Sequence, residues 1–405
     1  MRHIYTCILF FIVLSIQQAS AQFRIVGYLN TWDDFPDNAQ TIDFAKITHL
    51  NIAFANPDSK GNLTTFQGLS QVVKSAHANN VKVSMSLGGA DLGGTETNWK
   101  VLTSREHVHA FCKKLLAYVL AYNLDGLDVD LEGNIIGKNY GSFIQALSSA
   151  LKPKGKLVTA AVATWFADQI PASSFHYFDF VNIMSYDATG PWDPEHPGPH
   201  SPFSMAVSDL DFWAAKGLPK NKTGLGVPFY GWGFYNKASG NEYAYGDLVK
   251  QYPGAENRNK IADTIYYNGI PTITKKTRLA KQKASGIMIW QLTEDAAGKK
   301  SLLNAINETV NNCGASAQLN TIGSFNNNSI TITPNPTHGI LHLGIKNNSV
   351  NVRICIKTLD GREAMPSLIL TSSAQTINIS TLPAGIYMVN ILFDKKVVTQ
   401  KIVKL

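Results

Sequence analysis

Residues 124-LDGLDVDLE-132 alternate apolar side chains with carboxylates, and this alternation indicates a strand with one apolar face and one acidic face. Successive side chains of a strand point to opposite faces, so Asp128, Asp130 and Glu132 share one face while the apolar residues share the other. The apolar face requires a covering layer of helices. We therefore expect the three carboxylates to point into the interior of a barrel, with Glu132 at the carboxyl end of its strand.

Seven further short apolar runs accompany this strand. They are 24-RIVGYL-29, 47-ITHLNIAF-54, 81-VKVSMSL-87, 156-KLVTAAVA-163, 178-FDFVNIMSY-186, 224-GLGVPFYG-231 and 286-GIMIWQL-292. Residues 105–123 have the apolar spacing of a covering helix, which gives a strand-helix-strand unit. Eight such units over about 290 residues predict a closed (β/α)8 TIM barrel. An open doubly wound sheet is the alternative, but 29-LNTW-32 follows the first run in place of a Gly-rich phosphate loop.

The ends of the chain have a different composition. Residues 1–21 combine Arg2, a short apolar run and a terminal 19-ASA-21, which predicts a cleaved secretory signal peptide. The barrel is expected over 22–312, and the polar, Asn-rich residues 313–328 are expected to form a linker. Residues 329–405 alternate apolar and polar side chains between turn residues, which predicts a small all-β sandwich.

The positive charge does not favour nucleic-acid binding. The net charge is +7, but residues 325–405 contribute +5 through eight Lys/Arg against three Asp/Glu, and Arg2 contributes one more. About +1 remains for the whole barrel, which is too little for a basic binding surface. We expect no nucleic-acid partner.

The carboxylate row carries the chemistry. Alternate strand residues lie about 6.6 to 7 Å apart, so two ionised carboxylates repel by roughly 2 to 2.5 kcal/mol at an effective dielectric of about 20. One of them should therefore retain a proton near neutral pH, as a general acid requires. The alternative is an edge strand with its carboxylates in water, but an inner barrel strand has no such face.

The pattern DGLDVDLE resembles the DxxDxDxE signature of family 18 glycoside hydrolases, the chitinases and endo-β-N-acetylglucosaminidases. Further motifs in the family's order are 86-SLGG-89, which is similar to the end of its third strand, and 184-MSYD-187, which is similar to its sixth-strand motif. Gly27-Tyr28, 226-GVPFYG-231 and Trp290 also fit. The resemblance covers roughly residues 23 to 310.

The resemblance implies a mechanism in which the substrate's 2-acetamido group is the nucleophile. It makes Glu132 the acid and base, lets Asp130 orient the acetamide, and lets Asp128 exchange a proton or hydrogen bond with Asp130. Tyr186 would help to hold the acetamide. The remaining residues expected to bind substrate are Tyr28, Ser86, Gly88, Gly89, Met184, Asp187, Trp192, Tyr230 and Trp290.

Several aromatic and histidine residues allow a simpler interpretation. Trp290 could belong to the core, because it ends an apolar run, although the resemblance makes it the floor under the sugar. Trp192 and Trp232 are expected in loops after strands, and ordinary packing explains Trp232 equally well. His196 and His200 lack a third ligand at suitable spacing, so we predict no metal site and no cofactor.

Two departures from the family affect the leaving-group side of the cleft. Ala90 follows 86-SLGG-89 where a Trp is frequent, and Trp232 stands where many members have Arg. Only 54 residues separate Gly231 from Gly286, so the large insertion domain of some chitinases is expected to be absent or vestigial.

The tail has a resemblance of its own. The motifs 333-TPNP-336, 382-LPAGIY-387 and 401-KIVKL-405 are similar to the C-terminal sorting domain of type IX secretion cargo. A carbohydrate-binding sandwich is the alternative, but few aromatics are available there.

The two resemblances thus imply a secreted or cell-surface protein, expected to be a monomer, that cleaves β-1,4 bonds of chitin with retention. Its partners would be an N-acetylglucosamine-containing glycan and the outer-membrane secretion machinery. An endo-β-N-acetylglucosaminidase and a non-catalytic lectin remain the alternatives.

Overall fold

A computed structural model describes residues 23–236, 239–311, 330–345, 353–358, 364–365, 368–369, 374–393 and 396–405. The predicted signal peptide and linker lie outside these residues. Within the part described, no helix is both long and apolar enough to span a bilayer.

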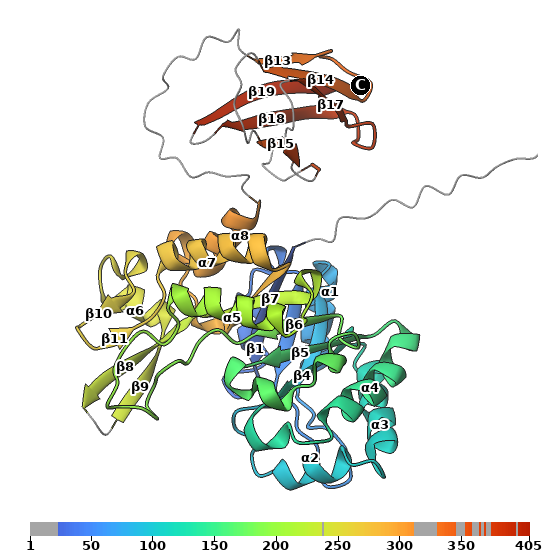
Figure 1. Ribbon diagram of the computed structural model, residues 1–405, viewed down its shortest axis with the longest axis vertical. Coiled ribbons are helices and arrows are strands. Elements are labelled where there is room, and N and C mark those ends of the chain that lie inside the picture. Colours follow the sequence, from blue (N-terminus) through green and yellow to red (C-terminus); the bar gives the residue numbers. More distant parts are fainter. Residues whose placement is uncertain are drawn as a thin grey trace, which may run out of the picture.

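Eight parallel strands close into a barrel, in the order β1-β12-β7-β6-β5-β4-β3-β2 (Figure 1). They are β1 (Arg24–Asn30), β2 (His49–Ala53), β3 (Lys82–Gly89), β4 (Gly126–Leu131), β5 (Leu157–Val162), β6 (Phe180–Ile183), β7 (Thr223–Pro228) and β12 (Gly286–Trp290). The predicted TIM barrel is confirmed, and each predicted apolar run contributes one of its strands.

Helices surround the barrel because each strand presents an apolar face outward (Figure 1). Leu127, Val129 and Leu131 of β4 belong to the large core between strands and helices. The helices are α1 (Leu69–Ala78), α2 (Glu96–Leu102), α3 (Val108–Ala121), α4 (Tyr140–Leu151), α5 (Phe203–Ala215), α6 (Tyr245–Gln251), α7 (Ile270–Lys283) and α8 (Leu302–Asn311). The predicted covering helix is α3, which buries Val108, Phe111, Leu115 and Val119.

A small four-stranded sheet is inserted between β7 and α7. Its order is β10-β11-β8-β9, and its strands are β8 (Tyr230–Asn236), β9 (Ser239–Ala244), β10 (Lys260–Ile261) and β11 (Ile265–Tyr266). The run 224–231 therefore divides at Phe229 between two sheets, because β7 ends at Pro228. This places Trp232 in strand β8, where we had expected a loop.

The described residues of the tail form two antiparallel sheets, with strand orders β13-β14-β17 and β16-β15-β18-β19. The strands are β13 (Ile330–Thr333), β14 (Ile340–Ile345), β15 (Arg353–Thr358), β16 (Leu368–Ile369), β17 (Ala374–Asn378), β18 (Gly385–Phe393) and β19 (Lys396–Lys404). Both sheets contribute to one apolar cluster, which includes Leu341, Ile356 and Ile402. The last strand, β19, pairs with β18 along nine residues.

Candidate active site

The carboxylate row lies at the centre of the barrel. Asp128 and Asp130 are buried on β4, at 0% and 2% exposure, and Glu132 follows the strand in an extended conformation that continues the alternation. The register places Ser86 of β3 and Thr159 of β5 beside Asp128, and Gly88 of β3 beside Asp130.

Three hydroxyl groups from three strands surround Asp128. The Tyr28 hydroxyl donates to Asp128 Oδ2 over 2.5 Å, Ser86 Oγ donates to the same oxygen over 2.9 Å, and Thr159 Oγ1 donates to Oδ1 over 2.5 Å. Burial raises the pKa of Asp128, and these three hydrogen bonds oppose that rise. Of the two buried aspartates, Asp128 is therefore the better prepared to hold a negative charge.

Asp130 has few partners. Its Oδ1 atom is buried and makes no hydrogen bond within the described part of the chain. Burial raises the pKa of Asp130 well above its usual value, and repulsion from Glu132 and then Asp128 adds to this. The surroundings therefore disfavour a negative charge on Asp130 more strongly than on Asp128.

Glu132 has the pKa of a group that can act as an acid at neutral pH. Burial is the main cause of a rise from 4.5 to about 7, and the negative charge of Asp187 is the second cause. A carboxyl with this pKa is protonated in about half of the molecules at pH 7, so it can donate a proton to a leaving oxygen and recover one from water.

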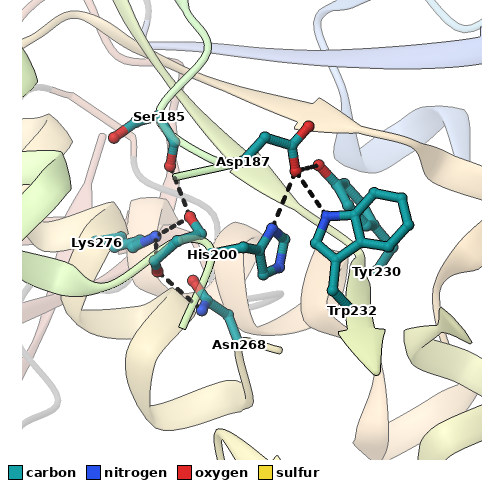
Figure 2. A network of polar contacts seen from close by, with 8 residues as sticks. Ser185, Asp187, His200, Tyr230, Trp232, Asn268 and Lys276 are labelled. Carbon is teal, nitrogen blue, oxygen red and sulfur yellow. Dashed lines mark hydrogen bonds and ion pairs between the residues drawn. The ribbon is translucent and has the colours of Figure 1, made fainter. Parts of the chain in front are cut away.

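Asp187 lies just beyond β6 and accepts three hydrogen bonds on one oxygen (Figure 2). The donors to Oδ1 are the Tyr230 hydroxyl at 2.6 Å, Trp232 Nε1 at 2.9 Å and His200 Nδ1 at 3.1 Å. Its backbone is held at a φ of 64°, in the left-handed region that a non-glycine residue rarely adopts. The carboxylate is thus fixed, and 28% of the side chain remains exposed.

An aromatic cluster lies over the end of β12. The Trp290 ring is 5.4 Å from that of Tyr28 and stacks on Phe54 at 5.5 Å, with an angle of 19° between the planes. Trp32 packs on both Phe54 and Trp290, at 6.2 and 6.3 Å, and is 58% exposed. Trp290 is therefore half-buried, and Trp32 and Phe54 extend its surface.

A second aromatic pair stands beside Asp187. Trp192 and Trp232 meet edge to face with their ring centres 5.5 Å apart. Trp232 also hydrogen-bonds to Asp187, whereas Trp192 is exposed. An exposed tryptophan after β5, Trp165, was not predicted from the sequence.

Other predicted residues shape the interior. Met184 and Tyr186 are buried in an inner apolar cluster with Met288. Gly88 has a φ of 108°, and a Cβ there would lie 2.2 Å from the Asp130 carbonyl oxygen. Gly89, at a φ of 89°, would meet the Phe54 ring at 2.6 Å. Both glycines are thus required by the backbone that brings β3 against its neighbours.

The two histidines of the loop 194–200 pair with different aspartates. His196 is exposed and contacts Asp193, whereas His200 is buried and contacts Asp187. Among the described residues, no group of three or more His, Cys, Asp or Glu is arranged to hold a metal ion. No motif or spacing predicts the contact between His200 and Asp187, which are 13 residues apart.

Comparison with known proteins yields two family matches. The model described as "Glycosyl hydrolases family 18" matches residues 24–295. The model described as "Secretion system C-terminal sorting domain" matches residues 331–405.

One solved structure and two sequence relatives illustrate the similarity of the barrel region to known proteins. A solved family 18 chitinase from the chitin utilization locus of Flavobacterium johnsoniae is 39% identical, with a TM-score of 0.68, over 72% of this chain and 94% of that one. A chitinase-like effector from Moniliophthora roreri is 30% identical over 58% of this chain, and an endochitinase from Brugia malayi is 27% identical over 65%. The matches span 65% and 60% of the lengths of these two relatives.

Proposed function

This chain belongs to family 18 of the glycosyl hydrolases, and from that membership we propose that it is a secreted, monomeric chitinase. It would cleave β-1,4 bonds between N-acetylglucosamine units with retention of configuration. The observation that carries the proposal is the inward row of Asp128, Asp130 and Glu132, in which the last residue has a pKa of about 7.

Glu132 is proposed as the acid and base. It gives its proton to the glycosidic oxygen, and the resulting carboxylate then takes a proton from the attacking water. Burial and the Asp187 charge raise the pKa of Glu132 to about 7, so that a protonated fraction of about one half is present in the free enzyme at neutral pH. The substrate's acetamide supplies the nucleophile for bond cleavage, as the family mechanism implies.

Asp130 is proposed to guide that acetamide. Its unpartnered Oδ1 atom is an acceptor ready for the acetamide N–H, and a negative charge on Asp130 would stabilise the positive oxazolinium intermediate. Asp130 can become charged by passing its proton to Asp128. The buried Tyr186 hydroxyl is proposed to hold the acetamide oxygen.

The aromatic surfaces suit the apolar C–H faces of a sugar. We propose Trp290 as the floor beneath the sugar that is cleaved, with Trp192 at a neighbouring subsite. The remaining proposed binding residues are Tyr28, Ser86, Gly88, Gly89, Met184, Asp187 and Tyr230. No cofactor takes part in this scheme.

Export is proposed to use both ends of the chain. The matched sorting domain indicates secretion or surface display through outer-membrane machinery, and residues 1–21 would direct the chain across the inner membrane as a signal peptide. After export, chitin or another N-acetylglucosamine glycan would be accessible to the barrel.

An endo-β-N-acetylglucosaminidase acting on N-glycan chitobiose cores would use the same acidic row. A lectin is less well supported, because Glu132 and Asp130 are intact and the pKa of Glu132 suits catalysis. The experiment is to incubate the purified protein with chitohexaose and, separately, with a high-mannose glycopeptide. Cleavage of chitohexaose supports the proposal, cleavage of the glycopeptide alone would replace chitinase by the second activity, and binding without cleavage would favour a lectin.

A further inference from the structure

His200 is completely buried and contacts the carboxylate that stands beside the acid. Its Nδ1 atom lies 3.1 Å from Asp187 Oδ1, and its ring packs 4.9 Å from the ring of Tyr230. Because Asp187 is a carboxylate, the Nδ1 atom must carry the hydrogen of this bond. The other two donors on the same oxygen, Tyr230 and Trp232, are uncharged.

Residues 200–201 also hold the backbone of the Asp187 segment. Ser201 Oγ donates to the Ser185 carbonyl oxygen over 2.6 Å, and the Ala188 N–H donates to the His200 carbonyl oxygen over 2.9 Å. Hydrogen bonds at Ser185 and Ala188 therefore hold the backbone before and after Asp187, in addition to those of its side chain. These bonds explain how its left-handed backbone is maintained.

Lys276 of α7 holds Ser201 in turn. Its Nζ atom is buried and donates to Ser201 O at 2.7 Å and Oγ at 2.6 Å, and Asn268 Nδ2 donates to the same carbonyl oxygen at 3.0 Å. Figure 2 shows Lys276 and Asn268 at one end of this network and His200 with Asp187 at the other. A helix on the outside of the barrel is thereby connected to the catalytic face.

We propose that His200 is a positioning residue for the reaction: it donates from Nδ1 to Asp187 and stays uncharged, so that Asp187 keeps one orientation and its full negative charge beside Glu132. This inference rests on the proposed function, in which Glu132 is the acid. A charged His200 would offset the carboxylate that helps Glu132 to keep its proton.

The surroundings favour the uncharged imidazole. Burial lowers the pKa of His200 and the nearby Lys276 acts in the same direction, while contacts with Asp187 and the Tyr230 backbone act against them. Burial also lowers the pKa of Lys276 to about 7, so only part of its charge is present at neutral pH. Among the described residues, His200 and Tyr230 contact Asp187, and its charge also acts on Tyr186, Glu132 and Glu242.

The first test measures the imidazole directly in the full chain. In protein with 15N-labelled histidine, the His200 signal is assigned as the one that is missing from His200→Asn. We expect this signal to keep the chemical shifts of a neutral Nδ1–H tautomer from pH 5.5 to 8. Titration of this signal near 6.5, or an Nε2–H tautomer, would overturn the proposal without any reference to activity.

The second test uses two variants at the same position. His200→Leu removes the donor, and we expect kcat on chitohexaose to fall at least about tenfold, as for a lost hydrogen bond to a charged group. The basic limb of kcat/KM should also move to lower pH. His200→Asn keeps an amide N–H at the position of the imidazole Nδ1–H. It should therefore retain most of the wild-type kcat and a basic limb close to that of wild type. His196→Leu, at an exposed histidine of the same loop, is the matched control.

These results separate the two hypotheses. If wild-type protein does not cleave chitohexaose, the proposed function fails, whatever the state of His200. If wild type is active and His200→Leu keeps its pH profile, or His200→Asn is impaired to the same extent as His200→Leu, then His200 only fills space and the positioning role is refuted.

Discussion

Replacing Asp187 by asparagine should move the basic limb of the kcat/KM profile towards lower pH. The negative charge of Asp187 is one of the two causes that raise the pKa of Glu132. Asparagine removes the charge but keeps an oxygen that can accept from His200, Tyr230 and Trp232. The geometry should therefore survive while Glu132 loses its proton more readily.

The size of the effect follows from the order of the causes. The pKa of Glu132 rises from 4.5 to about 7, and burial contributes the larger share. Asp187 accounts for at most about half of this rise, so we expect the limb to move by roughly one pH unit, or ~1.4 kcal/mol. At pH 7, the protonated fraction of Glu132 would fall from about one half to about one tenth.

The assay should use a natural leaving group. Chitohexaose requires full protonation of the departing oxygen, whereas activated aryl glycosides depend less on the acid. Initial rates over pH 4 to 9, at substrate concentrations well below KM, report the free enzyme. Asp193→Asn is the matched control, because Asp193 lies in the same connection between β6 and α5 and pairs with the exposed His196.

Two outcomes would refute this reasoning. A wild-type basic limb near pH 4.5 would mean that burial does not raise the pKa of Glu132. A limb that is unchanged in Asp187→Asn, with normal thermal unfolding, would mean that Asp187 acts on the substrate alone and not on the acid.

Three further predictions concern the row and the tail. Glu132→Gln should bind chito-oligosaccharides in calorimetry but lose about 10²- to 10⁴-fold in kcat; near-normal turnover would remove Glu132 as the acid. Asp130→Asn should lower kcat more than it raises KM, because the oxazolinium charge develops in the transition state; a change in KM alone would contradict this role. A protein limited to residues 22–314 should hydrolyse soluble oligosaccharides like the full chain but stay in the periplasm; continued export with loss of activity on crystalline chitin alone would identify the tail as a binding module.

The barrel could be predicted from the sequence because its strands are short apolar runs and its helices have the 3.6-residue period. The acidic row could be predicted for the same reason, since alternation along a strand fixes which side chains share a face. This alternation predicts that Asp128 and Leu127 point to opposite faces of β4. The division of residues 224–231 was missed because Phe229 is as apolar as its neighbours and gives no sign of a change of sheet.

The contacts around Asp187 could not be predicted, because they join elements that the sequence separates. His200 has the residue type of a metal ligand, whereas its buried partner is Asp187, 13 residues earlier in the same connection between β6 and α5. Trp32 and Phe54 lie after different strands, and nothing in the sequence shows that they stack beside Trp290. Closure of the barrel brings the ends of different strands together, and the spacing of residues along the chain does not reveal these contacts.

The buried aspartates of β4 lower the stability of the folded protein at neutral pH, although the proposed reaction needs them. Burial raises the pKa of Asp130 well above its ordinary 3.8, so the folded protein binds more protons than the unfolded chain between these two values. Stability from this group is therefore greatest in acid and declines as the pH rises through that window. Laboratory selection for thermal stability at neutral pH would accordingly favour apolar replacements of the buried aspartates of β4. The most stable variants would then lack the carboxylates proposed for catalysis.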